Sequence, residues 1–176
     1  MNIKSISKFL SLILRHNPET IQLTLDEHGW ADVATLLQQC KAHGRGITFA
    51  ALETVVAEND KQRFTFNEDK TRIRANQGHS INVELDLPQA TPPEFLYHGT
   101  VHKFMKEIRT NGLKRMSRHH VHLSENLGTA ENVGNRRGVA KILTICSGQM
   151  HRDGIPFYLS ANGVWLTDEV PPRYIQ

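Results

Sequence analysis

The chain has 176 residues, of which 39% are hydrophobic and 22% charged, an ordinary balance for a globular protein. This length allows a real hydrophobic core, and its two cysteines, Cys40 and Cys146, form no CxxC pair. A disulfide scaffold, a redox motif and a zinc ribbon are therefore disfavoured. The net charge of +3 permits an anionic partner without requiring one. The N-terminal residues indicate neither a signal peptide nor a membrane span, so we expect a cytoplasmic protein.

The proline-rich segment at residues 88–93 is the clearest boundary, because three of its six residues are proline. Proline fixes φ and lacks a backbone donor, so neither a helix nor a central strand is expected there. We therefore expect an α+β protein of two lobes, residues 1–90 and residues 91–176. Basic residues number ten against eleven acidic ones in residues 1–93, and eleven against seven in residues 94–176.

The first lobe begins with an amphipathic helix, whose apolar residues follow the spacing of one helix face: Ile6, Phe9, Leu10, Ile13 and Leu14. Ser5 or Ser7 is a suitable N-cap, and Asn17-Pro18 is expected to end the helix. Further helices are predicted over residues 33–41, after Asp32, and over residues 49–58, after Thr48.

Residues 63–66 and 71–75 alternate polar and apolar side chains, which predicts a β-hairpin. Three helices followed by a hairpin are the outline of a winged helix, and by analogy such modules bind nucleic acid. One alternative is a DNA-binding protein with a ligand-sensing second lobe. Residues 49–58 argue against it, because they contain no Lys or Arg, whereas groove reading needs cations for phosphate contacts.

The second lobe is predicted to be a mixed α/β lobe. Residues 95–98 form a strand expected to end at Gly99, and residues 101–111 a helix closed by Gly112. Further strands are predicted over residues 120–123, 140–146 and 164–166, with a helix over residues 129–133.

Arginine and histidine dominate the polar clusters. Arg15-His16 ends the first helix, either as a cation pair that complements the helix dipole or as a phosphate site. Arg63 opens the hairpin, Arg74 lies on its return strand, and a polar cluster around a glycine follows: Gln77, His79 and Ser80.

In the second lobe, Arg118, His120, His122 and Ser124 would share one face of a strand. Such a face favours an anionic ligand lying along the strand. A metal site at His120 and His122 is the weaker alternative, since no carboxylate or cysteine lies within two residues of either histidine. The sequence contains no phosphate-binding GxxxxGK[ST] motif, no GxGxxG and no HExxH. Arginine and histidine chemistry suits a phosphate-bearing substrate.

Taken together, the motifs resemble the tRNA (RNA) 2′-phosphotransferases of the KptA-like family over nearly the whole chain. The resemblance rests on SKFLSLILRHNPE (7–19), LDEHGWADV (25–33), KQRF (61–64), IRANQGHS (73–80), PPEFLYHGT (92–100), RHHVHLS (118–124) and NGVWLT (162–167), in that order.

The resemblance implies a winged-helix RNA-binding lobe joined to an ADP-ribosyltransferase-like lobe that binds NAD. It implies a transferase of tRNA splicing that removes an internal 2′-phosphate from RNA, with NAD as co-substrate. The phosphate attacks C1″ of the nicotinamide ribose and expels nicotinamide, giving a 2′-phospho-ADP-ribosyl RNA. The ribose 2″-hydroxyl then attacks phosphorus, so the products are 2′-OH RNA and ADP-ribose 1″,2″-cyclic phosphate.

The family's catalytic set falls on Arg15, His16, Arg63 and Arg118. Our interpretation is that the three guanidiniums bind the 2′-phosphate and offset charge in the second step, while His16 handles a proton. No metal is required, because the guanidiniums do that work.

On the NAD side, the resemblance places the Gly99 backbone at the carboxamide and His98 at a ribose hydroxyl. It adds three residues to the same cleft: Thr100, His122 and Ser124. Where many ADP-ribosyltransferases carry a glutamate, this chain has Val164, which fits a nucleophile that is already an anion. Contacts to RNA or to the cleft are expected from Arg74, Gln77 and His79.

The second alternative is an ADP-ribosyltransferase that modifies nucleic-acid or protein termini without completing phosphate removal. The product distinguishes the two activities, since one yields 2′-OH RNA and the other a stable ADP-ribosylated polymer. A monomer is the default expectation for the oligomeric state.

Overall fold

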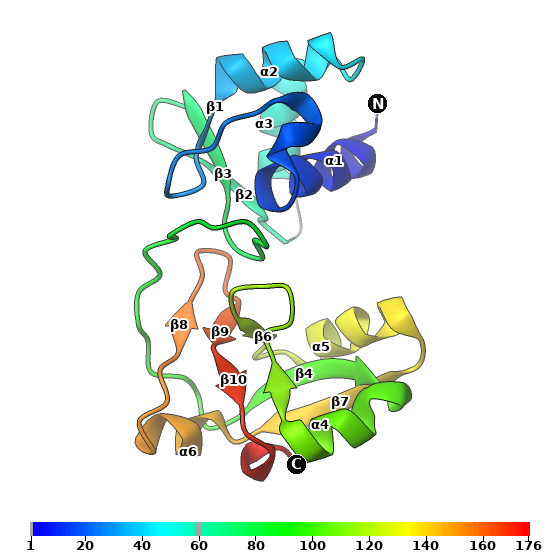
Figure 1. Cartoon of the computed structure of the whole chain (residues 1–176), viewed down its shortest axis with the longest axis vertical. Helices are drawn as coiled ribbons and strands as arrows, with labels where there is room; N and C mark the ends of the chain where they lie inside the picture. The colour runs from blue at the N-terminus through cyan, green and yellow to red at the C-terminus, as the bar shows by residue number, and fades with distance from the viewer. Residues whose placement is uncertain (1, 59–60) are drawn as a thin grey trace. The chain divides into compact units, whose positions relative to one another are not determined.

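The computed structural model describes residues 2–58 and 61–176, and the chain divides into two compact units, Met1–Asp86 and Leu87–Gln176. Each unit combines helices with small antiparallel sheets, which agrees with the predicted α+β class (Figure 1). Each also has a hydrophobic core of its own. Within the described residues, no helix has the length and apolar composition needed to cross a membrane.

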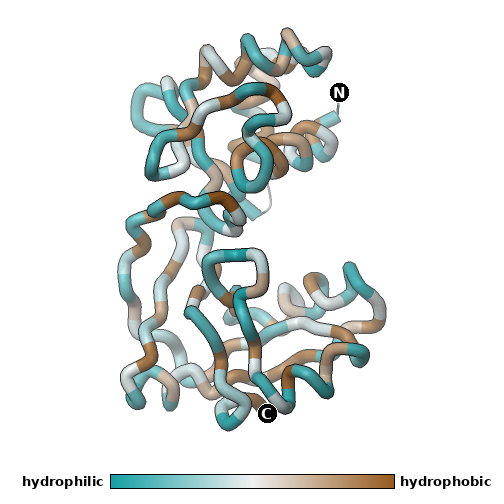
Figure 2. The backbone as a smooth tube through the Cα atoms, in the orientation of Figure 1, coloured by the Kyte–Doolittle hydropathy of each residue, from teal (hydrophilic) through white to brown (hydrophobic). Residues whose placement is uncertain are grey.

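The first helix, α1 (Ile3–Arg15), packs against the core of the first unit through its predicted apolar face, and hydrophobic residues return at each of its turns (Figure 2). Leu10 and Leu14 are fully buried, and burying a leucine contributes about 1.5–3 kcal/mol. The cap prediction was wrong by one turn. Asn2 is the N-cap and accepts a hydrogen bond from the Ser5 N–H at 2.8 Å, so that Ser5 and Ser7 both lie inside the helix.

The two remaining helices of this unit begin at the predicted caps. α2 (Val33–Ala42) follows Asp32, whose carboxylate accepts a first-turn N–H at 2.7 Å. α3 (Phe49–Ala57) follows Thr48, whose hydroxyl accepts another at 3.2 Å. A short 3₁₀ helix, η1, links α1 to the rest of the unit at Pro18–Ile21.

The predicted hairpin forms an antiparallel pair, β2 (Phe64–Phe66) with β3 (Arg72–Ala75). A short strand, β1 (Ala31–Asp32), pairs with the other edge of β3, so that the order is β1-β3-β2. β1 was not predicted, because two residues carry no readable alternation. Its pairing joins the start of α2 to the hairpin.

The second unit is built around β4 (Leu96–Val101) and β7 (Ala140–Ile145), which pair along their full length. A second sheet has the order β6-β9-β8, and β10 pairs with β5. These strands are β5 (Leu113–Lys114), β6 (Val121–Leu123), β8 (Tyr158–Leu159), β9 (Trp165–Thr167) and β10 (Glu169–Val170). A bridge between Tyr97 and Ser124 brings β6 to the edge of β4.

Helices cover these strands, with α5 on one side of the β4–β7 pair (Figure 1). They are η2 (His102–Phe104), α4 (Met105–Asn111), α5 (Leu127–Gly134), η3 (Asn135–Arg137), α6 (Ser147–Arg152) and η4 (Pro172–Tyr174). Most of the predicted elements are present with shifted ends. The predicted helix over residues 101–111 begins as the 3₁₀ helix η2, and Gly112 follows its end at φ 77°.

The strand predicted to end at Gly99 continues through it to Val101. A glycine is needed at this position for packing instead. A Cβ at Gly99 would lie 1.7 Å from the carbonyl oxygen of Ala130, which belongs to α5. The strand and the helix therefore approach each other closely only because residue 99 has no side chain.

Replacing Gly99 with alanine is expected to destabilise the second unit by about 1–3 kcal/mol or more, because backbone must shift to admit the methyl group. The free energy of urea unfolding measures this effect. Gly46→Ala is the control, since nothing lies within 4 Å of a Cβ there. Equal unfolding energies for the two variants would contradict the close packing of α5 on β4.

Candidate functional site

In the first unit, Arg15 and Arg63 lie side by side. Arg15 ends α1 and is 9% exposed, and its Nη2 donates to the Arg63 carbonyl at 3.5 Å. The Arg63 guanidinium reaches the Ser7 hydroxyl at 3.4 Å. Arg15 thus contacts the main chain of Arg63, and both residues bring a positive charge to this part of the first unit, which suits an anion.

His16 follows directly as the C-cap of α1. Its Nδ1 lies 2.9 Å from the hydroxyl of Ser80, which comes from the segment after β3. The structure thus brings three of the four predicted catalytic residues together within the first unit. The fourth, Arg118, belongs to the second unit.

The three predicted RNA or cleft contacts have different surroundings. The Arg74 guanidinium stacks over Trp30 at 4.5 Å from the ring centre. Among the described residues, Arg74 Nε and Gln77 Oε1 are buried polar atoms without a hydrogen-bond partner. Such atoms are costly unless a ligand or water satisfies them. His79 is only 1% exposed and packs against Gly29.

In the second unit, a hydrogen-bonded chain links three predicted site residues. His98 Nδ1 donates to the carbonyl oxygen of His122 at 3.0 Å. The Arg118 guanidinium lies 3.0 Å from His122 Nδ1. Arginine can only donate, so His122 Nδ1 accepts this bond and the proton of the neutral ring sits on Nε2. His98 consequently offers an acceptor at Nε2, and His122 a donor.

The charges near these three hydrogen-bonded residues are predominantly positive. Desolvation, together with Arg137 and Arg136, lowers the pKa of Arg118, which still remains charged at neutral pH. Burial lowers the pKa of His98 below its ordinary value, and the charges of Arg118 and Arg137 act in the same direction. His98 is therefore neutral near pH 7, in a setting that favours anions.

Stability is expected to fall as the pH drops through about 6.5, because the unfolded chain then binds a proton at His98 that the folded chain excludes. Burial likewise lowers the pKa of His120, which adds a loss of the same sign. Urea unfolding above and below this pH measures the change. His98→Gln should show a smaller loss than the parent protein, and an identical loss would contradict the assignment.

The predicted four-residue strand face does not form. β6 covers only Val121–Leu123, and Arg118 lies in the preceding turn, from which it folds back onto His122. A turn followed by a short strand therefore replaces the predicted polar strand face. Its physical cause is the turn at Arg115–Arg118, where the Arg118 N–H donates to the Arg115 carbonyl.

The remaining residues predicted on the NAD side are buried or hydrogen-bonded to the main chain. Thr100 is 8% exposed on β4, and the Ser124 hydroxyl bonds the backbone of Asn126 at the start of α5. Tyr97 exchanges both backbone bonds with Ser124, so Gly99, two residues on, directs its N–H and C=O to the same strand edge. The backbone groups at that edge could therefore form hydrogen bonds with a planar amide.

The weaker metal alternative rested on His120 and His122, which have different neighbours. His120 Nε2 lies 3.9 Å from Asp168, whereas His122 Nδ1 is engaged by Arg118. Across residues 2–58 and 61–176, no group of three or more His, Cys, Asp or Glu side chains is placed to hold a metal ion.

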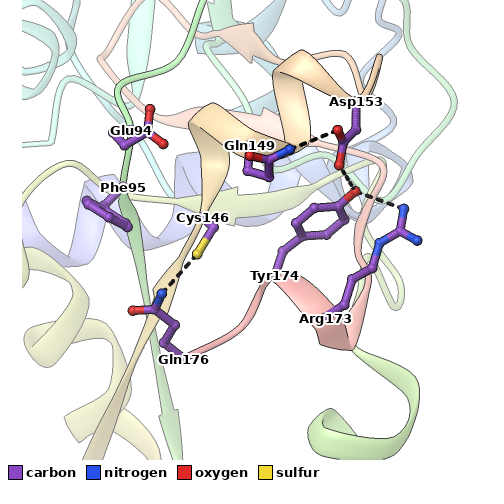
Figure 3. A pocket seen from close by; sticks show the side chains of 8 residues that line it. All are labelled: Glu94, Phe95, Cys146, Gln149, Asp153, Arg173, Tyr174 and Gln176. Carbon is purple, nitrogen blue, oxygen red and sulfur yellow. Dashed lines mark hydrogen bonds between the residues drawn. The ribbon is translucent and has the colours of Figure 1, made fainter.

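A cavity of about 550 Å³ lies elsewhere in the second unit, and Figure 3 shows the residues that line it: Glu94, Phe95, Cys146, Gln149, Asp153, Arg173, Tyr174 and Gln176. Several of its polar groups bond one another. The Tyr174 hydroxyl donates to Asp153 at 2.6 Å, and Gln176 donates to the Cys146 sulfur at 3.2 Å. None of the predicted site residues lines this cavity, and its internally bonded groups do not converge on a ligand.

From the sequence, Ser80 had no role of its own, and Arg137, with Arg136 after Gly134, was expected only as a source of further cations for an anionic ligand. Ser80 stood in a polar cluster with Gln77 and His79, and the sequence signal was that the cluster holds more hydrogen-bonding groups than a plain turn needs. Arg137, in η3, follows α5 in a loop-like run, and only the fold brings its charge near His98 and Arg118.

Comparison with known proteins shows matches over nearly the whole chain. Residues 2–169 match the family model "RNA 2'-phosphotransferase, Tpt1 / KptA family". A protein of Flavobacterium johnsoniae named "Probable RNA 2'-phosphotransferase" is 62% identical, covering 98% of this chain and 95% of its own. Proteins with the same name from Burkholderia pseudomallei and Rhodopirellula baltica are 55% and 52% identical, each covering 97% of this chain and 92% and 94% of their own.

Proposed function

The chain belongs to the RNA 2′-phosphotransferase family, and from this premise we propose that it removes an internal 2′-phosphate from RNA with NAD as the acceptor. Membership alone supports a transferase that acts on RNA. The observation that carries the finer proposal is the chain of Arg118, His122 and His98, which offers a cation, a donor and an acceptor within one unit.

We propose that the first unit is a winged-helix lobe and the second an ADP-ribosyltransferase-like lobe. The strand order β1-β3-β2 with three helices supports the first assignment. The family resemblance supports the second. We further propose that Arg74 and Gln77 contact RNA from the first unit, because each has a buried polar atom that a ligand could satisfy, whereas His79 is itself buried.

NAD fits the polar groups of the second unit. The neutral His98 would accept a hydrogen bond from a ribose hydroxyl, and the backbone edge at Gly99 would read the carboxamide. Thr100, His122 and Ser124 would flank them. When bound, NAD supplies a ribose that accepts the phosphate and a nicotinamide that leaves.

The chain's own residues act on the phosphate. Arg15, Arg63 and Arg118 would bind its oxygens and offset the charge that grows during transfer, as preorganised guanidiniums do in phosphoryl-transfer sites. His16 would move a proton at the attacking hydroxyl or at the RNA 2′-oxygen that leaves. On this proposal the substrate's own anion is the first nucleophile, so no carboxylate base is needed.

The test is nicotinamide release from NAD in the presence of a short RNA with one internal 2′-phosphate. The matched controls are the same RNA with a 2′-hydroxyl and the same RNA with a terminal phosphate. Release only with the internal 2′-phosphate supports the proposal. Release with terminal phosphates, leaving a stable ADP-ribosylated RNA, would instead identify a terminus-modifying transferase.

A further inference from the structure

Ser80 makes two contacts to the end of α1, at the positions where the proposed catalytic residues lie. Its backbone N–H donates to the Arg15 carbonyl at 2.9 Å. Its hydroxyl lies 2.9 Å from Nδ1 of His16. The two partners are adjacent in sequence, so one residue fixes both the main chain before His16 and the imidazole ring itself.

The segment that carries Ser80 is anchored at its other end. The Asn76 N–H donates to the Arg63 carbonyl at 2.8 Å, and its side-chain amide donates to the Gln62 carbonyl at 2.6 Å. Gly78 turns the chain at φ 87°, and His79 is buried. Residues 76–80 therefore run from Arg63 to His16 as a strap held at both ends.

We propose that Ser80 is a positioning residue for His16, an inference that rests on the proposed role of His16. The serine hydroxyl occupies Nδ1, so that Nε2 is the nitrogen that exchanges the proton during phosphate transfer. The hydrogen bond to Nδ1 restricts the orientation of the ring, and its loss widens the range of rotamers that the ring samples. Proton transfer needs the heavy atoms within hydrogen-bond reach, so the fixed orientation raises the rate.

The short side chain suits this task, because a serine loses little conformational entropy when it is fixed. The same hydrogen bond sets the protonation pattern of the ring. With the serine oxygen accepting from Nδ1–H, Nε2 is the base of the neutral ring and the acid of the protonated ring. The reacting nitrogen is the same in both roles, which is the part of the proposal that can be measured.

The experiment is steady-state kinetics of Ser80→Ala and Ser80→Thr with a 2′-phosphorylated RNA and NAD. Ser80→Ala should lower kcat about tenfold and leave KM for both substrates within about twofold, because position and not binding is lost. Ser80→Thr, which keeps the hydroxyl, should recover most of the rate. Ser5→Ala, which removes an exposed hydroxyl of α1, is the matched control and should leave kcat unchanged.

A readout independent of activity separates positioning from general damage. Long-range ¹H–¹⁵N spectra of the His16 ring should show one nitrogen bonded in the parent protein and a different tautomer balance in Ser80→Ala, with urea unfolding midpoints alike. Unchanged ring signals, or a loss of kcat that threonine does not recover, would overturn the inference. His16→Ala distinguishes the two proposals: if it retains full activity, the proposed role of His16 falls as well, whereas an inactive His16→Ala beside a fully active Ser80→Ala would overturn only the role of Ser80.

Discussion

Replacing Arg63 with alanine is expected to lower the rate of 2′-phosphate removal by about 10²–10³-fold, the usual loss when one preorganised charge-stabilising donor is removed. The physical reason is the proposed binding of the phosphate by the Arg63 guanidinium, in the part of the first unit where Arg15 contacts the Arg63 carbonyl. Arg63→Lys should recover little, because a lysine cannot make the two parallel bonds that an arginine makes to phosphate oxygens. Product formation under single-turnover conditions measures the effect.

The control for Arg63 is Arg72→Ala in the same hairpin. Arg72 is exposed and pairs with Asp26 at 3.3 Å, a contact worth less than about 1 kcal/mol. Its removal should leave the rate within about twofold of the parent. A rate for Arg63→Ala close to that of Arg72→Ala would remove Arg63 from the catalytic set.

The second large effect is expected at Arg118. Arg118→Ala should again lose about 10²–10³-fold in rate, because it removes the one proposed phosphate ligand of the second unit. If both guanidiniums bind the same phosphate, as proposed, the Arg63→Ala, Arg118→Ala double variant should lose far less than the product of the single losses, since residues that act together on one group are not additive.

Arg109→Ala, an exposed arginine of α4, is the matched control for Arg118. Strict additivity of the double variant would indicate that Arg63 and Arg118 serve separate steps or separate ligands. Urea unfolding of each variant separates loss of chemistry from loss of folding.

Elements with periodic apolar spacing or a clear cap were predictable from the sequence. The stripe from Ile6 to Leu14 defined α1, and Asp32 and Thr48 marked the starts of α2 and α3. Two-residue strands such as β1 could not be predicted, because they exist only through pairing with a distant partner. Gly99 was misjudged as a strand end because its cause, the carbonyl of Ala130, lies on another element.

For the candidate site, the sequence supplied residue types, and the fold supplied contacts. Motif order named His98, Arg118 and His122, yet nothing in the spacing shows that His98 bonds the His122 carbonyl. Ser80 and His16 are 64 residues apart, so their hydrogen bond depends on how the strap returns to α1. Local patterns report local structure, whereas tautomers and pKa values are set by neighbours brought in by the fold.

The measurement that tests the central proposal most directly follows RNA and nucleotide products together, after the protein is incubated with NAD and an RNA carrying one internal 2′-phosphate, without added metal. We predict 2′-OH RNA, free nicotinamide and ADP-ribose 1″,2″-cyclic phosphate in equal amounts. Intact 2′-phosphorylated RNA beside unconsumed NAD would contradict NAD-dependent phosphate transfer by this protein.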